Sequence, residues 1–204
     1  MNPRATLVLV RHGETPANID GVWHGSTDSP LTPRGERQSL RVARHVGAHY
    51  PDATTIYSSD LQRARVAADA IGQALGCERT LTPELREYDL GSWEGKKYSE
   101  LHDVHDLWHH MRTNPDFAPH GGESPKGVTE RFTAALRRIA DRHVGERVVV
   151  VAHGGAMSLA MGALLNGDYT KWHPVMDNCA VSELVLDPAP ALLRFNFTEH
   201  LDGL

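Results

Sequence analysis

The stretch from Leu7 to Asn18, LVLVRHGETPAN, constrains the fold of this chain more than any other. Its first four residues form an uninterrupted apolar run, of the length that suits a strand buried on both faces in a parallel sheet. In an open α/β sheet, ligands bind just beyond the carboxyl ends of such strands. Arg11 and His12 stand at that end, and Gly13 lets the backbone turn close to a ligand. This stretch therefore predicts a binding site at the end of the first strand.

The rest of the chain alternates predicted strands and helices, which is typical of a mainly parallel sheet covered by helices on both faces. We expect further strands at 54–57, near 81 and at 148–151, and helices at 33–50, 59–76, 98–112, 125–145 and 154–165. The tail, 180–186 and 191–197, is expected to add an antiparallel hairpin. The predicted fold class is therefore α/β: a three-layer α/β/α sandwich formed by residues 1–204 as a single domain, with a small lid insertion at about 90–124.

Length and charge exclude several other classes of protein. With 204 residues, the chain can form one sizeable core but is short for two full domains. A net charge of −5 argues against a general nucleic-acid binder and against a protein of anionic membrane surfaces. No apolar run reaches the length of a membrane helix, and the first residues do not resemble a signal peptide. Two cysteines form no disulfide framework, so a reducing cytoplasmic location is expected.

Three later stretches are predicted to bring matching groups to the end of the first strand. The strand at 148–151 leads to His153, and Gly154 and Gly155 then open a helix whose first N–H groups are free to bind an anion. The strand at 54–57 leads to two serines and to Arg63 in the first turn of a helix. If these strands are neighbours, two arginines, two histidines and backbone donors converge on a phosphate-shaped site.

Two imidazoles in such a site suggest chemistry as well as binding. A neutral imidazole can attack phosphorus and form a phospho-enzyme, and a protonated one can stabilise charge on the transferring group. A departing alkoxide then needs a proton donor, for which Glu87 is the preferred candidate because its loop can cover the site. Ser58 and Ser59 are expected to cap a helix, since no adjacent base is evident.

With these motifs, the sequence resembles the histidine phosphatase superfamily, which is also called phosphoglycerate mutase-like. The motifs that carry the resemblance occur in the family's order and cover most of the chain: RHGET at 11–15, Asn18, 25–32, SSDLQRA at 58–64, LREYDLGSWEG at 85–95, GGES at 121–124 and VAHGG at 151–155. The short form of the chain is more similar to the phosphatase branch than to the mutase branch. The run at 118–124 is similar to actinobacterial sugar-phosphoglycerate phosphatases.

The resemblance implies roles for individual residues. His12 would be the phosphorylated nucleophile and Glu87 the proton donor. Arg11, Arg63 and His153 would bind the phosphoryl group, and Asn18 would help to hold it. His24, Gly25 and Gly154 complete the expected substrate-binding set, although the family often has Gln where this chain has His24. No metal and no other cofactor is expected.

These observations predict a phosphomonoesterase that hydrolyses a small phosphorylated metabolite, of the sugar phosphate or phosphoglycerate type, through phosphorylated His12. A phosphoglycerate mutase and a non-catalytic phospho-ligand-binding protein remain alternatives. Nucleic acid and membranes are not expected partners, and a homodimer is left open.

The histidine-rich segment 102–110 allows two interpretations. His105 and His109 share a helix face and could bind zinc. We favour a polar lid over the pocket instead, with Trp108, Phe117 and His120 as candidate substrate walls, because nearby loops do not supply a closed set of ligands.

Overall fold

The sheet is built around the first strand, β1 (Thr6–Arg11), which pairs in parallel with β4 (Arg147–Ala152). The computed structural model describes residues 4–204 and orders the six strands β3-β2-β4-β1-β5-β6. The parallel strands β2 (Thr55–Ser58) and β3 (Arg79–Leu81) extend one side of this pair. The antiparallel strands β5 (Val181–Val185) and β6 (Ala191–Phe197) extend the other side. The predicted α/β fold with a mainly parallel sheet is confirmed.

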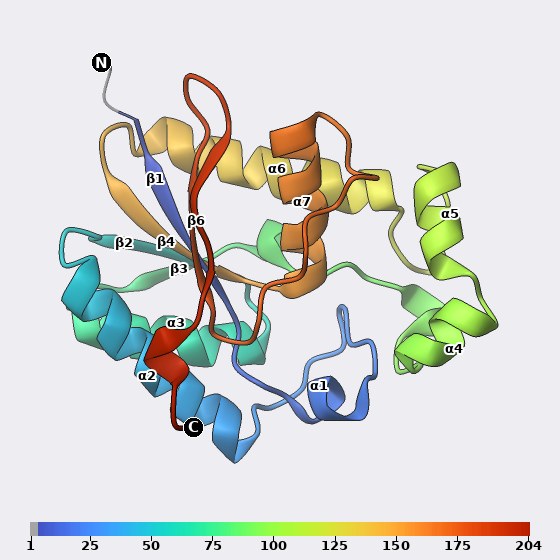
Figure 1. Ribbon diagram of the computed structural model, residues 1–204, viewed down its shortest axis with the longest axis horizontal. Helices are drawn as coiled ribbons and strands as arrows, with labels where there is room; N and C mark the ends of the chain where they lie inside the picture. Colours follow the sequence, from blue (N-terminus) through green and yellow to red (C-terminus); the bar gives the residue numbers. More distant parts are fainter. Residues whose placement is uncertain (1–3) are drawn as a thin grey trace.

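Helices cover both faces of the sheet (Figure 1). On one face lie α2 (Pro33–His49) and α3 (Gln62–Leu75), packed against Val8 and Val10 of β1. On the other lie α6 (Pro125–Arg142) and α7 (Gly154–Asn166), packed against Leu7 and Leu9. Successive side chains of a strand point to opposite faces, so the apolar run 7–10 is continuous because both faces are buried.

Two further helices, α4 (Tyr98–Asp103) and α5 (Leu107–Thr113), stand away from the sheet at one end of the molecule (Figure 1). One helix was expected over 98–112, but the chain turns between them, where Asp106 has a φ of 46°. The start of α4 is joined to the loop that follows α1 (Pro16–Asp20): Val22 bridges to Lys97, and the Tyr98 N–H donates to the Gly21 carbonyl at 2.8 Å. No helix within residues 4–204 is long and apolar enough to cross a membrane.

The start of α3 differs from the sequence expectation. Ser58 and Ser59 were expected to cap this helix, but α3 begins at Gln62 behind Leu61, whose side chain offers no cap. Among the backbone N–H groups at the start of α3, the Ser59 hydroxyl accepts only from that of Leu61, at 3.3 Å. The Gln62 N–H donates to both carboxylate oxygens of Asp28, at 2.9 and 3.1 Å. A capping group from 34 residues upstream cannot be found by reading local sequence patterns.

We expect Asp28→Ala to lower the free energy of unfolding by about 1 kcal/mol, because it removes the side-chain acceptor at the start of α3. Asp69→Ala, which removes a solvent-exposed ion pair with Arg79 at 2.7 Å, should cost less than about 0.5 kcal/mol. Urea unfolding of the two variants checks the difference. Equal losses would show that Asp28 does not act as a cap.

Candidate active site

The sheet brings together the residues that the sequence placed at its edge. Arg11 at the end of β1 pairs with Ala152 at the end of β4, so that His12 and His153 follow side by side. Their ring centroids lie 5.1 Å apart. The neighbouring strand β2 pairs with the other side of β4, and the Ser59 N–H donates to the Val151 carbonyl at 3.0 Å. The convergence predicted from three separate stretches is therefore present.

Hydrogen bonding sets the tautomer of His12. Its Nδ1 lies 2.7 Å from the Gly13 carbonyl oxygen, which can only accept, so Nδ1 carries the proton. In the neutral ring, Nε2 then has the free lone pair. Burial and the nearby charges of Arg11 and Arg63 hold the pKa of His12 well below its usual value, so the ring is neutral at pH 7. A neutral imidazole with a defined free nitrogen is the form that can attack phosphorus.

His153 is fully buried and has a different set of partners. Its Nδ1 accepts from the Nε of Arg63 at 3.2 Å, so its Nε2 carries the proton and donates to the Ser59 hydroxyl at 2.8 Å. Burial, followed by the charge of Arg63, holds the pKa of His153 well below its usual value. The sequence analysis considered a protonated second imidazole, but this environment favours the neutral ring. His153 does not line the cavity and contacts Arg63, which does.

The two arginines use their donors differently. Arg63 directs four of its five N–H groups to fixed acceptors: His153 and the carbonyls of Thr27, His24 and Gly25, the last at 2.7 Å. Arg11 makes one bond, from Nη1 to the Met176 carbonyl at 2.5 Å, and its buried Nε has no partner within residues 4–204. Burial lowers the pKa of both groups, and Glu87 opposes that shift. Arg11 is therefore the side chain with the most donors free for an anion.

Glu87 occupies the helix terminus that the sequence assigned to an anion. One of its carboxylate oxygens accepts from the Gly155 N–H at 2.8 Å, and the other accepts from Ala156 at 2.5 Å and from Tyr88 at 2.8 Å. Glycine at position 155 leaves room for this carboxylate, because a Cβ there would lie 2.8 Å from the Glu87 Oε1 in its present position. Gly155 lines the cavity, whereas Gly154, the predicted substrate contact, does not.

The other predicted binding residues take up separate positions. Asn18 lines the cavity. Its Oδ1 accepts from the N–H and the hydroxyl of Thr15, so the Asn18 amide nitrogen points away from Thr15. His24 also lines the cavity. Gly25 does not: its N–H donates to the Glu94 carboxylate, and a Cβ there would lie 2.1 Å from the Tyr88 carbonyl. The geometry gives Gly25 the role of holding Arg63 through its carbonyl.

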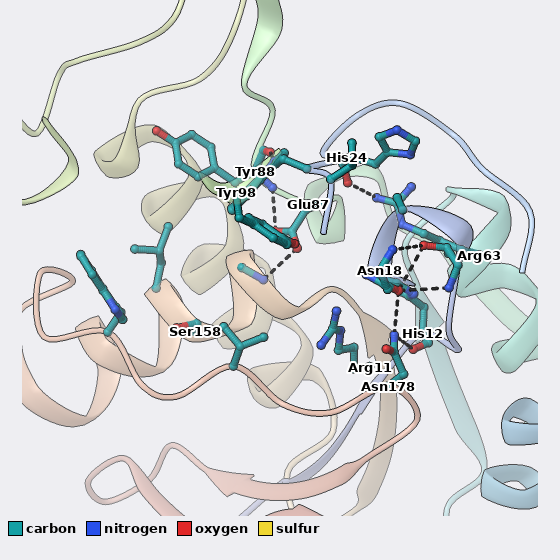
Figure 2. A pocket seen from close by; sticks show the side chains of 18 of the residues that line it. Arg11, His12, Asn18, His24, Arg63, Glu87, Tyr88, Tyr98, Ser158 and Asn178 are labelled. Atoms are coloured by element: carbon teal, nitrogen blue, oxygen red, sulfur yellow. Dashed lines mark hydrogen bonds between the residues drawn. The ribbon is translucent and has the colours of Figure 1, made fainter. Parts of the chain in front are cut away.

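Asn178 is a site residue that the sequence analysis missed. Its Nδ2 donates to the His12 carbonyl and to Asn18 Oδ1, both at 3.1 Å, so it holds two predicted site residues together. Figure 2 shows Asn178 beside His12 and Asn18. A signal existed in the sequence: the amino end of an antiparallel strand lies at the same edge as the carboxyl ends of its parallel neighbours. A polar residue just before 180–186 was therefore a candidate.

A cavity of about 420 Å³ opens in front of these groups. It is lined by Arg11, His12, Thr15, Ala17, Asn18, Val22, Trp23, His24, Arg63, Glu87, Tyr88, Tyr98, Trp108, Met111, Gly155, Ser158, Leu159, Trp172, Val175 and Asn178. Of the three predicted substrate walls, Trp108 is present. Phe117 and His120 are not, because Phe117 stacks on His110 with centroids 4.2 Å apart and His120 is exposed.

The zinc interpretation of the histidine-rich segment finds no support in the described chain. Residues 4–204 contain no group of three His, Cys, Asp or Glu side chains that could hold a metal ion. His105 instead packs on Trp93, with centroids 4.5 Å apart, and its Nε2 lies 3.4 Å from Glu100.

With this geometry in place, comparison with known proteins identifies the class. Residues 7–198 match the model of the histidine phosphatase superfamily (branch 1), and the chain belongs to this superfamily. The chain is 36% identical over 189 residues to a probable phosphoglycerate mutase, GpmB, of Cronobacter sakazakii, covering 91% of this chain and 87% of the relative. It is 35% identical to the protein of the same name from Klebsiella pneumoniae, with the same coverage.

Solved structures of phosphatases have the same fold. A mycobacterial glucosyl-3-phosphoglycerate phosphatase complexed with VO3 superimposes with a TM-score of 0.83 at 28% identity, covering 95% of this chain and 99% of that one. A phosphoserine phosphatase from Entamoeba histolytica, complexed with 3-phosphoglyceric acid, also gives 0.83 at 28% identity, covering 97% and 99%. The predicted family is thus confirmed, and the protein is an enzyme of the histidine phosphatase type.

The neutral state of the buried imidazoles predicts how stability depends on pH. In the unfolded chain a histidine titrates near pH 6.5, whereas His153 stays neutral in the folded protein well below that pH. The unfolded state then binds more protons, so the free energy of unfolding falls as the pH decreases below 6.5. In His153→Asn this slope should be smaller than in the native protein by up to about 1.4 kcal/mol per pH unit.

Urea unfolding between pH 6.5 and 5 measures the slope. Ser59→Ala is the control, because it removes one hydrogen-bond partner of His153 but keeps the imidazole, and it should retain the native slope. An unchanged slope in His153→Asn would mean that this ring is protonated in the folded protein.

Proposed function

We propose that the protein hydrolyses phosphate monoesters of small metabolites, with Nε2 of His12 attacking phosphorus to form a phosphohistidine. The observation that carries this proposal is the 2.7 Å contact between His12 Nδ1 and the Gly13 carbonyl, which leaves Nε2 as the free nitrogen of a buried neutral ring. Arg11 and Arg63 supply positive charge beside it, where the three outer oxygens of a transferring phosphoryl group carry charge. Asn18 and Asn178 complete the polar end of the cavity.

Glu87 is the proposed proton donor to the departing alkoxide. It is the only carboxylate among the described residues that line the cavity. Glu14, which follows His12 by two residues and is the next carboxylate to consider, does not line the cavity: it accepts from the Thr32 hydroxyl and from Arg34, both at 2.8 Å. After the alcohol leaves, the same Glu87 carboxylate accepts a proton from the water that attacks the phosphohistidine. Each half-reaction thus restores the protonation state that the other needs.

Water, in preference to a retained alcohol, is the proposed acceptor of the phosphoryl group. Two residues that line the cavity remain in contact with solvent: Tyr98 is 38% exposed and Val175 is 53% exposed. A mutase must keep its dephosphorylated substrate bound until the phosphoryl group returns. The names of the GpmB relatives make a mutase the second candidate. Interconversion of 3- and 2-phosphoglycerate faster than phosphate release would favour that candidate.

A cytoplasmic location is proposed on the state of the cysteines. Cys77 and Cys179 are both free thiols, which fits a reducing compartment. The single-domain organisation over 1–204 and the homodimer stay predictions. A binding protein without turnover is disfavoured because His12 and Glu87 face one cavity together.

The nucleophile can be tested directly. His12→Ala should lose essentially all hydrolysis of 4-nitrophenyl phosphate, because no phospho-enzyme can form. The native protein, quenched during turnover, should carry an acid-labile phosphoryl group at position 12 that mass spectrometry locates. Asn178→Ala, which removes a support of His12 but not the ring, is the control and should keep the phosphorylated intermediate. Substantial activity in His12→Ala would contradict the mechanism.

The role of Glu87 can be separated from that of His12 by the choice of leaving group. A nitrophenolate leaves readily without a proton, whereas an alkoxide does not, and general-acid catalysis is worth roughly 10²–10⁴-fold. Glu87→Gln should therefore reduce kcat/KM for an alkyl phosphate about 10²-fold or more relative to its effect on 4-nitrophenyl phosphate. The ratio within one variant cancels any loss of folded protein, and kcat/KM reports phosphorylation alone. Equal losses on both esters would remove Glu87 from the acid role.

A further inference from the structure

The cavity has two ends of different chemistry. Arg11, His12, Arg63 and Asn178 gather at one end, and Ser158 lies across the cavity from them, with Glu87 between (Figure 2). Under the proposed function, the polar end binds the phosphoryl group. The other end must therefore receive the alcohol part of the ester, and its lining determines which alcohols fit.

Helix α7 shows how far the second end extends. Its start at Gly155 meets Glu87, and Leu159 lines the cavity one turn further along. The backbone of Trp172 packs on Gly162, where a Cβ would lie 2.8 Å from the Trp172 Cα. Seven residues of helix separate Gly155 from Gly162, or about 10 Å along the axis. The Trp172 backbone therefore lies about 10 Å along α7 from the end of the helix that meets Glu87.

Helix α5 closes the same end from the other side. The Arg112 guanidinium lies 4.7 Å from the ring centre of Trp172, which places α5 beside that ring. The neighbouring Trp108 and Met111 of α5 both line the cavity. With Leu159 and Trp172, they form what we call the apolar wall: Trp108, Met111, Leu159 and Trp172.

The apolar wall offers little to a charged group. Arg11 and Arg63 are the only arginines or lysines among the described lining residues, and both lie beside His12. Arg112 is exposed and does not line the cavity. The hydroxyl of Ser158 already donates to the His173 carbonyl. A carboxylate on the alcohol would lose water at this end without gaining a cation.

Resting on the proposed function, we infer that the enzyme prefers phosphate monoesters of uncharged alcohols with an apolar or aromatic body, and discriminates against esters whose alcohol carries a carboxylate. The phosphate of such an ester sits at Arg11 and His12, and its alcohol packs on the apolar wall. This substrate class differs from phosphoglycerate and phosphoserine, which appear in the names of the relatives described above, since glycerate and serine both carry a carboxylate.

Two aryl phosphates of matched reactivity test the inference. 4-Butylphenyl phosphate and 4-(2-carboxyethyl)phenyl phosphate have similar leaving groups, because two methylenes insulate the ring from the carboxylate. The tails are similar in length, and one ends in an apolar ethyl group where the other ends in a carboxylate. We expect kcat/KM to favour the butyl ester by at least about tenfold, the discrimination that apolar pockets commonly provide. Equal values, or a preference for the carboxylated ester, would overturn the inference.

Variants of α5 locate the preference in the apolar wall. Trp108→Arg places a cation at this wall and should reduce the ratio between the two esters at least about tenfold, while Trp108→Leu should retain it. Val104→Arg is the control for added charge: Val104 is 72% exposed, lies just before α5 and does not line the cavity. It should keep the native ratio. An unchanged ratio in Trp108→Arg would show that the wall does not contact the alcohol.

Two further measurements separate this inference from the proposed function. Phenyl phosphate carries neither tail, so its hydrolysis tests the chemistry at His12 without any effect of the tail, and a failure to hydrolyse it would count against the proposed function. The non-hydrolysable phosphonates with the same two tails report binding without turnover. Tighter binding of the butyl phosphonate, measured by calorimetry, would support the preference for apolar alcohols even if phenyl phosphate were not hydrolysed. Equal binding of the two phosphonates would overturn that preference.

Discussion

The buried guanidinium of Arg63 is the constraint on which the site depends. Taking a full charge out of water is costly unless fixed partners replace the water. Here the partners are three backbone carbonyls of one loop, at Thr27, His24 and Gly25, and the imidazole of His153. The loop and the end of β4 are therefore held together by a single side chain from α3. Removing any partner leaves a charge with too few acceptors, so the arrangement is rigid before any substrate arrives.

The same logic explains why the two imidazoles differ. Arg63 donates to Nδ1 of His153, so that its Nε2 carries the proton, whereas Nδ1 of His12 donates to the Gly13 carbonyl and leaves Nε2 without a proton. Both rings are neutral because burial and the arginines act in the same direction on each pKa. Two histidines at the ends of adjacent strands thus hold opposite tautomers because their hydrogen-bond partners differ.

The sequence predicted the parts of the site that depend on sheet topology and missed those that depend on long-range contacts. Two apolar runs, one followed by Arg11-His12 and the other by His153, were sufficient to predict where these side chains meet. The carboxyl ends of parallel strands lie at the same edge of a sheet. Two long-range contacts were missed. Asp28 caps α3 from 34 positions upstream in the sequence, and Glu87 binds the start of α7 from 68 positions upstream. Gly154 and Gly25, which the family resemblance implied to be substrate contacts, do not line the cavity. Their motifs are correct, but glycine serves close packing at these positions.

The division of the cavity between sheet-end residues and peripheral segments has a consequence for how such enzymes diversify. The groups beside His12 are joined to the hydrophobic core through β1, β4 and α3, so substitution there threatens folding itself. Trp108 comes from a helix outside the sandwich, Trp172 comes from the connection between α7 and β5, and both are only partly buried. Mutations at these two positions cost less in stability than mutations of fully buried residues. Natural selection can therefore redirect the enzyme to new esters by drift in two surface segments, while its reaction chemistry is inherited unchanged.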